Sequence, residues 1–421
     1  TGLAAFAPST GGAEGGSTRR GGALTPNHPV TVQDVAASFK RIFTVSSPTA
    51  GTFYNGIVGA AACLKTPVSC DLSKGVVVDP AKNEIVLHLD APDPELPYKL
   101  SVPHAAVLPA SAPVKDAGNV PIPTTGPYMA ASYDPNRALK LVRNPSFKEW
   151  SHDAQPQGYS DTIDETFWYL AMNTNLAPFN NVKVRQAINF AVDRNAAVKL
   201  YGGEKLAQPV CTFLPPGFPG HEDDCQYTKG GGKTWTAPDV DKAKQLIKES
   251  GTAGQAVGIV VQDDEVNKSI GEYVQSLLSS LGYKATLKPI SANIQFTYIQ
   301  NTKNNVQISL TSWYQDYPAA SDFLNVLESC ASFTPGSDSS INIAGFCNKA
   351  IDAQIKDALV TEQTGLDAAN AKWAQVDRAV MAQAPVAPLF TPKIIDFTSK
   401  RVGNYQFSRQ FYMLISQLWT K

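Results

Sequence analysis

The sequence predicts an α/β protein with more than one domain. The chain has 421 residues, and a chain of that length is expected to divide into two or more domains. Residues 257–261, 284–290 and 306–313 have the apolar pattern of strands, and residues 268–281 have the apolar period of a helix. This alternation of strand and helix is typical of α/β domains with a parallel or mixed sheet.

Composition indicates a folded protein that does not bind nucleic acid. Hydrophobic residues make up 43% of the chain and charged residues 17%, which separates it from disordered sequences. The 36 basic and 37 acidic residues nearly cancel, and no basic run is present that would neutralise phosphates. No apolar run approaches the roughly 20 residues of a membrane helix. We therefore expect neither a nucleic-acid partner nor a membrane-spanning segment.

The N-terminal part is predicted to be a flexible tether followed by a helix. Residues 1–22 are rich in Gly, Ser, Thr and Ala and have no sustained apolar period. They also lack the pattern of a signal peptide, so we expect any such peptide to have been removed. Thr31 and Asp34 form a capping pair, and Val35, Phe39 and Ile42 follow on one helical face.

The middle of the chain changes from proline-rich to regular segments. Residues 93–151 are predicted to form edge strands and turns rather than helices. Residues 166–174 alternate in size as a strand does, and the next helix carries an apolar stripe and ends at Gly202. Further predicted elements are a helix from Pro238 to Gly251, helices starting at Ala350 and Ala368, and a last buried strand at residues 385–392.

The six cysteines fall into three local pairs. These are Cys63 with Cys70, Cys211 with Cys225, and Cys330 with Cys347. An even number of cysteines in an exported chain favours three disulfides in this pairing. Free thiols and a metal site are the alternatives, although zinc spacing such as Cys-x2-Cys is absent and Cys211, His221 and Cys225 have no obvious fourth ligand.

The segment TSWYQDYPAASDF, residues 311–323, is the predicted ligand site. It continues a strand, and Pro318 should stop that strand because proline fixes φ and cannot donate a backbone hydrogen bond. Four side chains then fall where the chain leaves the sheet: Trp313, Tyr314, Asp316 and Tyr317. A carboxylate between aromatic walls suits a ligand with a cationic head and apolar parts. The alternative is a core tryptophan beside a solvated aspartate.

No catalytic constellation is recognisable in the sequence. The five histidines are scattered, and neither G-x-S-x-G nor H-E-x-x-H occurs. The run GGGKT at residues 230–234 is not a phosphate-binding loop, because a Walker motif needs glycine where Tyr227 stands. We therefore expect a binding protein without catalytic residues, metal or cofactor, and keep a secreted hydrolase as the alternative from another class.

Taken together, these segments resemble family 5 of the bacterial extracellular solute-binding proteins, the peptide- and dipeptide-binding proteins of ABC importers. The site matches the family's pattern at Trp313, Asp316, Tyr317, Pro318 and Phe323. Other matches are Gly21, Gly22 and Leu24; Val30, Thr31, Asp34, Val35, Ser38, Phe39, Arg41 and Ile42; Thr125, Gly126, Pro127 and Tyr128; Arg143, Asn144, Pro145, Phe147 and Trp150; Asn173, Thr174, Val184, Arg185, Ala187, Ile188, Ala191, Val192, Asp193 and Arg194; and Phe346 and Asn348. The chain departs from the family at Ala319, where many members carry a second acid.

The resemblance implies a two-lobe α/β fold of the periplasmic-binding-protein (Venus-flytrap) type, with an extra subdomain in the first lobe. The expected parts are a tether at residues 1–22, the first lobe at 23–165, the second lobe at 166–393, and a return to the first lobe at 394–421. Family segments are absent before Val30 and after Glu165, so the first lobe is expected to be incomplete relative to the family. Either this member is trimmed or the sequence omits parts of the chain.

The resemblance also implies the function. The protein would capture oligopeptides or dipeptides by hinge closure and deliver them to a membrane permease, with nickel chelates, haem, oligosaccharides and siderophore-like compounds as alternative ligands. Asp316 would pair with the α-ammonium of the peptide, and the remaining ligand-binding residues would be Trp313, Tyr314, Tyr317, Phe323 and Asn173. We expect a monomer that is extracellular or periplasmic and is tethered to the outer face of the cell membrane as a lipoprotein, although this sequence contains no lipid-bearing N-terminal cysteine.

Overall fold

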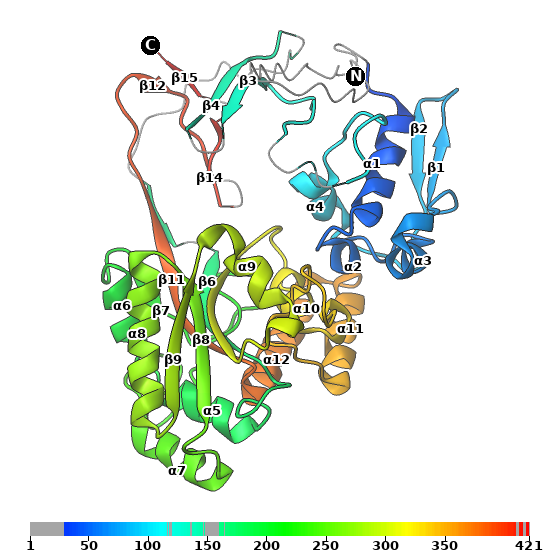
Figure 1. Ribbon diagram of the computed structural model, residues 1–421. Helices are drawn as coiled ribbons and strands as arrows, with labels where there is room; N and C mark the ends of the chain where they lie inside the picture. Colours follow the sequence, from blue (N-terminus) through cyan, green and yellow to red (C-terminus); the bar gives the residue numbers. More distant parts are fainter. Residues whose placement is uncertain are drawn as a thin grey trace. The chain divides into compact units, whose positions relative to one another are not determined.

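The chain divides into two compact units. The computed structural model describes residues 29–115, 117, 120–134, 137–145, 147, 160–163, 165–409, 412–415 and 418–420. Unit 1 comprises residues up to 158 together with 398–421, and unit 2 comprises residues 159–397 (Figure 1). The predicted tether, the match at residues 21–24 and Trp150 lie outside the described residues.

Unit 2 is built on a mixed sheet of seven strands within the described residues. The strand order is β5–β11–β6–β10–β8–β9, and β7 pairs with β11. The strands are β5 (Ser160–Ile163), β6 (Thr166–Met172), β7 (Ala207–Pro209), β8 (Ala256–Gln262), β9 (Lys284–Ile290), β10 (Ile308–Tyr314) and β11 (Val386–Asp396). Strand β8 runs parallel to β9 and β10, whereas β6 runs antiparallel to β10 and β11. The predicted strands and the mixed sheet are therefore confirmed.

The expected boundaries between the two parts shift by a few residues. They were placed at 165/166 and 393/394, whereas unit 2 extends from residue 159 to residue 397. The reason is strand β5, which pairs antiparallel with the end of β11 and so joins both flanking segments to the sheet of unit 2.

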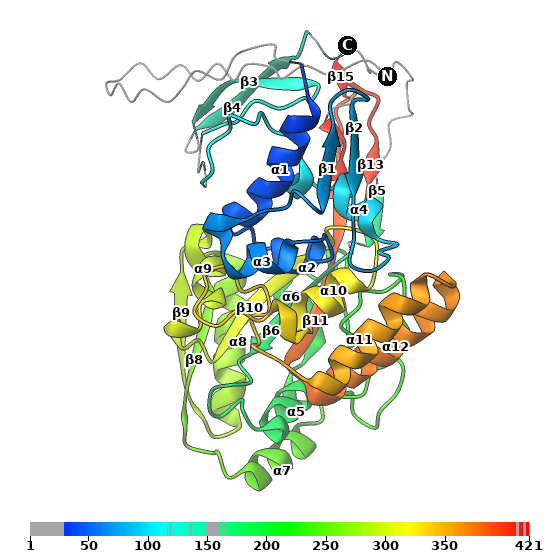
Figure 2. The ribbon, with the colours of Figure 1, turned by 90° about the vertical axis from the view of Figure 1, so that its right-hand side faces the viewer.

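Helices cover both faces of this sheet. One face carries α5 (Val182–Ala191), α6 (Arg194–Tyr201), α7 (Val240–Ser250) and α8 (Glu265–Ser280), whose apolar residues form one core with those of β6, β8, β10 and β11. The other helices are α9 (Ala292–Gln300), α10 (Ser321–Glu328), α11 (Lys349–Glu362) and α12 (Leu366–Gln383), with the 3-10 turns η3 (Thr302–Asn304) and η4 (Cys330–Ser332). Figure 2 shows α11 and α12 packed side by side.

Aromatic side chains form the core on the second face. Successive strand residues point to opposite faces, so Leu170 joins the first core while Phe167 and Tyr169 point the other way. Phe167 stacks on Tyr169 with ring centroids 4.5 Å apart, and it also contacts Phe213 and Phe323. Phe323 belongs to α10, so this aromatic core attaches α10 to the sheet.

One predicted helix is two helices in the structure. The sequence predicts a single helix that ends at Gly202, but α5 stops before Val192, which has an extended ψ of 123°. The carboxylate of Asp193 then accepts hydrogen bonds from the backbone N–H groups of Asn195 and Ala196 and starts α6. The predicted ends at Gly202 and Gly251 are confirmed.

Unit 1 contains short helices and two-stranded sheets. Its helices are α1 (Val32–Thr44), α2 (Ala50–Phe53), α3 (Ala60–Lys65) and α4 (Leu96–Ser101), with the 3-10 turns η1 (Pro67–Ser69) and η2 (Pro103–Ala105). The paired strands are β1 (Val76–Asp79) with β2 (Glu84–Leu87), β3 (Tyr128–Asp134) with β4 (Ala138–Arg143), β12 (Val402–Gly403) with β15 (Trp419–Thr420), and β13 (Phe407–Ser408) with β14 (Tyr412–Met413).

Two predictions for unit 1 have different outcomes. The capping box of α1 is confirmed, because the Asp34 carboxylate accepts the Thr31 N–H at 2.8 Å and the Asp34 N–H donates to the Thr31 hydroxyl at 3.3 Å. The prediction of strands and turns alone over residues 93–151 is wrong at α4. A proline in its first turn is compatible with a helix, since the N–H that proline lacks has no intrahelical partner there.

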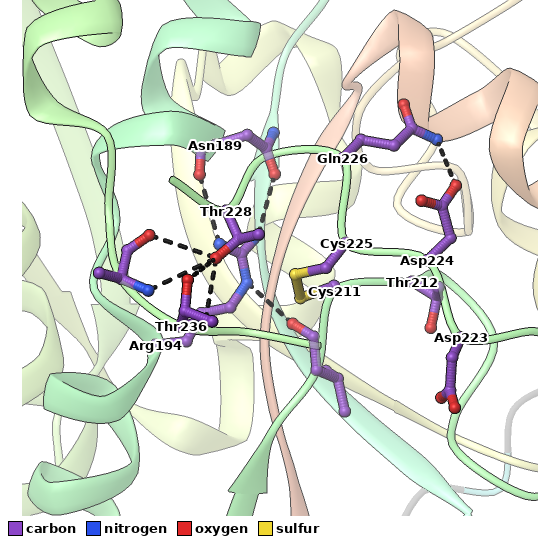
Figure 3. Close-up of a disulfide and its surroundings, with 12 residues drawn as sticks. Asn189, Arg194, Cys211, Thr212, Asp223, Asp224, Cys225, Gln226, Thr228 and Thr236 are labelled. Atoms are coloured by element: carbon purple, nitrogen blue, oxygen red, sulfur yellow. Dashed lines mark hydrogen bonds between the residues drawn. A yellow bond between two sulfur atoms is a disulfide. The ribbon is translucent and has the colours of Figure 1, made fainter. Parts of the chain in front are cut away.

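All six cysteines form the three predicted disulfides. Figure 3 shows the bond between Cys211 and Cys225, beside which the buried Arg194 donates from Nε to the Val210 carbonyl at 2.8 Å. Both sulfurs are used in this bond, so the alternative of a metal site at these cysteines and His221 is wrong.

Among the described residues, no helix is both long and apolar enough to cross a membrane.

Candidate ligand-binding site

The structure brings most of the predicted site residues together where β10 ends and α10 begins. At the end of β10, Trp313 pairs with Phe167 and Tyr314 pairs with Thr166 of β6. The chain then leaves the sheet through residues 315–320 and enters α10. All of these residues belong to unit 2, so the geometry of the site is internal to one compact unit.

Asp316 is a half-buried carboxylate in the connection between β10 and α10. Its backbone N–H donates to Oδ2 of Asp322 at 2.7 Å. Partial removal from water raises the pKa of Asp316 from 3.8 to about 6. A partly buried carboxylate is stabilised in its ionised form when a cation meets it.

Two of the four predicted aromatic residues reach the surface. Tyr314 is 49% exposed, and Trp313 is half-buried. The indole Nε1 of Trp313 is buried and has no hydrogen-bond acceptor within the described part of the chain. The partly exposed rings offer apolar area, whereas the indole N–H is covered in this structure.

The other two aromatic residues are buried. The hydroxyl of Tyr317 hydrogen-bonds with that of Ser321 at 2.8 Å. Phe323 is fully buried and packs against Phe167 and Phe218, with ring centroids 5.8 and 4.9 Å away. In this structure both residues support the connection between β10 and α10, and their contact with a ligand stays a prediction.

The structure does not bring Asn173 to this place. Asn173 follows the last residue of β6, which pairs with Ile308 at the start of β10 rather than with its end. Six residues along β6 separate it from the partner of Trp313, which corresponds to roughly 20 Å at about 3.4 Å per residue. Its side chain donates to the Val306 carbonyl at 3.1 Å and accepts the Asn175 N–H at 3.0 Å.

A buried pair next to Asp316 was not among the predicted site residues. The Gln315 N–H donates to the Glu165 carbonyl at 3.2 Å, and the Gln315 amide donates to the Glu165 carboxylate. Each of the two residues is 7% exposed. They are 150 positions apart in the chain, so no local sequence pattern could have indicated the pair.

Among the described residues, no group of three or more His, Cys, Asp or Glu is arranged to hold a metal ion. The groups that the site presents are one half-buried carboxylate and partly exposed aromatic rings.

Comparison with known proteins identifies the family. The family model of the bacterial extracellular solute-binding proteins, family 5 Middle, matches residues 25–165 and 152–335. The glutathione-binding protein GsiB of Salmonella typhimurium is 25% identical over 293 residues, which cover 66% of this chain and 49% of that protein. The dipeptide-binding protein DppE of Bacillus subtilis is 26% identical over 252 residues, 58% of this chain and 43% of that protein. The chain spans about half the length of the curated relatives it matches.

The fold is similar to that of a dipeptide-binding protein from Pseudoalteromonas sp. SM9913, solved in complex with Met-Leu. The TM-score is 0.73 at 19% identity, and the likeness covers 100% of this chain and 91% of that one. At this identity the likeness shows the fold alone, which is the predicted α/β two-lobe fold of periplasmic binding proteins. The matched family model covers more than half of the residues, and the chain belongs to the bacterial extracellular solute-binding proteins of family 5.

Proposed function

We propose that this protein is the substrate-binding receptor of an ABC importer and that it captures dipeptides or oligopeptides by their α-ammonium group. The observation that carries the proposal is the half-buried carboxylate of Asp316, placed beside partly exposed aromatic rings at the end of a central strand. Relatives named dipeptide- and glutathione-binding proteins support a peptide ligand, because each of these compounds has a free α-amino group.

Loss of water from the Asp316 carboxylate explains why a cationic ligand group suits this site. Burial already disfavours the ionised form of Asp316, and a ligand that covers it removes more water. A cationic ammonium offsets this cost by pairing with the carboxylate, whereas a neutral group does not. The half-exposed ring of Tyr314 and the indole of Trp313 can then cover the apolar part of the ligand.

The wider role follows from the family. The protein acts as a binding protein rather than an enzyme, closes over its ligand by a hinge, and passes the ligand to a permease in the membrane. It works outside the cytoplasmic membrane as a lipid-anchored monomer. A main-chain mode of recognition would allow many peptides to bind, since all peptides share the same backbone groups.

Calorimetric titration with Met-Leu and N-acetyl-Met-Leu tests the proposal. We expect the wild-type protein to bind Met-Leu and to lose on the order of 2 to 5 kcal/mol of affinity when the ammonium is blocked, the usual effect of removing one partner of a buried charge pair. Asp316→Asn keeps the size of the side chain and should lose a comparable amount with Met-Leu. Equal affinity for both peptides would show that Asp316 does not bind the ammonium.

A second measurement tests the ligand class. Mass spectrometry of compounds that co-purify with the protein should recover peptides. Recovery of sugars, haem or metal chelates without any peptide would refute the peptide ligand and leave a receptor for another solute.

A further inference from the structure

We propose that Asp322 is a positioning residue that fixes the carboxylate of Asp316 for the ligand, an inference that rests on the proposed function. Asp322 lies in the first turn of α10 and is fully buried. Its Oδ2 accepts the backbone N–H of Asp316 at 2.7 Å. The bond fixes the backbone from which the Asp316 side chain projects.

The segment between these two aspartates is closed by further hydrogen bonds. The Asp322 N–H donates to the Ala319 carbonyl at 3.0 Å, and the hydroxyls of Tyr317 and Ser321 lie 2.8 Å apart. These bonds hold the loop to itself. The Asp322 carboxylate, in contrast, joins the first turn of α10 directly to the residue that is proposed to bind the ligand.

The residue before Asp316 is fixed from the other side. Gln315 is bound through its backbone and its side chain to Glu165, which lies directly before β6. Asp316 thus lies between a strand end held by Glu165 and a helix start held by Asp322. A side chain held in its binding geometry loses less conformational freedom when the ligand arrives, so this arrangement favours binding.

The place of residue 322 in the first turn of α10 also supports a positioning role. Because α10 is attached to the sheet through Phe323, its rigid first turn gives Asp322 a fixed position. The Oδ2 acceptor of Asp322 therefore acts on the loop through a hydrogen bond that helix packing holds in place.

Peptide selectivity separates positioning from a general effect on the fold. Titrations with Met-Leu and N-acetyl-Met-Leu should be made on the wild type and on Asp322→Ala, Asp322→Asn and Ser321→Ala. We expect Asp322→Ala to weaken Met-Leu binding roughly tenfold, as for one lost hydrogen bond, and to leave N-acetyl-Met-Leu binding nearly unchanged. Asp322→Asn keeps an acceptor oxygen and should retain most of the preference. Ser321→Ala removes the bond to Tyr317 in the same loop and serves as the control with unchanged preference.

Each outcome decides the inference. Equal weakening of both peptides by Asp322→Ala, or no weakening of either, would overturn it. If the wild-type protein binds neither peptide, the proposed function itself is refuted. If the wild type prefers Met-Leu and Asp322→Ala keeps that preference, only the positioning role of Asp322 is refuted. If Asp322→Ala does not fold, Asp322→Ser replaces it, because its hydroxyl ends one atom short of Oδ2 and cannot reach the Asp316 N–H as the carboxylate does.

Discussion

The two ends of strand β10 have opposite chemistry. At the start, the Gln307 side chain accepts the Gly258 N–H at 2.7 Å and donates to the carbonyls of Ala177 and Ala256 at 2.7 and 3.1 Å. Asn173 is likewise bonded to its neighbours there. We call this the closed end. At the open end, the last residues of β10 and the segment after them present a half-buried carboxylate and partly exposed rings.

Among the described residues, buried polar atoms without a hydrogen-bond partner occur near both ends of β10, and Ser309 Oγ is the one near its start. Buried atoms without a hydrogen-bond partner at the open end are Thr166 Oγ1, Trp313 Nε1 and Gln315 Oε1, whereas Asn173 and Gln307 have none. A buried polar atom without a partner costs free energy, and a ligand that provides one recovers it. The hydrogen-bonded side chains of Asn173 and Gln307 therefore stabilise the closed end, whereas the half-buried carboxylate and the partly exposed rings make the open end the place for the proposed ligand.

The largest expected effect concerns the aromatic core that supports the open end. Phe323→Ala removes a fully buried ring from the aromatic core, so we expect a loss of about 3 to 5 kcal/mol in the free energy of unfolding, measured with urea. Tyr314→Ala is the matched control. Its ring is 49% exposed, so its loss of stability should be within about 0.5 kcal/mol while its peptide affinity falls.

A small loss of stability in Phe323→Ala, with a large loss of Met-Leu affinity in protein that remains folded, would reverse this interpretation. Phe323 would then be a ligand-binding residue, as the family resemblance implies.

The next effect tests the closed end. Asn173→Ala leaves the Val306 carbonyl and the Asn175 N–H without their partner, so we expect a loss of about 2 kcal/mol in unfolding free energy. Its affinity for Met-Leu should equal that of the wild type, because the residue lies far from Asp316 along the sheet. An affinity loss in titration, with stability unchanged, would show that Asn173 binds the ligand as the sequence predicts.

Local signals in the sequence predict the end of β10, the site that follows it and the three disulfides. The alternation in residues 306–313 and the proline at position 318 placed the end of β10 and the site that follows it. The short spacings of the cysteines predicted all three disulfides. Such features depend on residues that are close in the chain, where period, turn chemistry and loop length act directly.

The features that could not be predicted depend on tertiary contacts. The pairing of Glu165 with Gln315 joins β6 to the end of β10 across 150 positions. The sequence predicts Phe323 as a ligand-binding residue and gives no role to Asp322. Only the packing of α10 shows that Phe323 lies in the aromatic core and that Asp322 accepts the Asp316 N–H. The break at Asp193 depends on a competition between a helix cap and helix continuation, which composition alone does not decide.

The smallest expected effect concerns the stability of the ligand-free protein and its dependence on pH. The pKa of Asp316 is raised from 3.8 to about 6 in the folded state, so the folded protein holds this proton more tightly than the unfolded chain does. The contribution of Asp316 to stability is therefore fully present below pH 3.8 and is lost as the pH rises through 6.

Asp316→Asn has no such loss, so at pH 7 it should be more stable than the wild type, by about 1 kcal/mol after allowance for partial exposure. Urea unfolding at pH 4 and pH 7 measures the difference, which should be near zero at pH 4. A variant that is less stable than the wild type at pH 7 would mean that the ionised carboxylate supports the fold, and the open end would then be built for stability like the closed one.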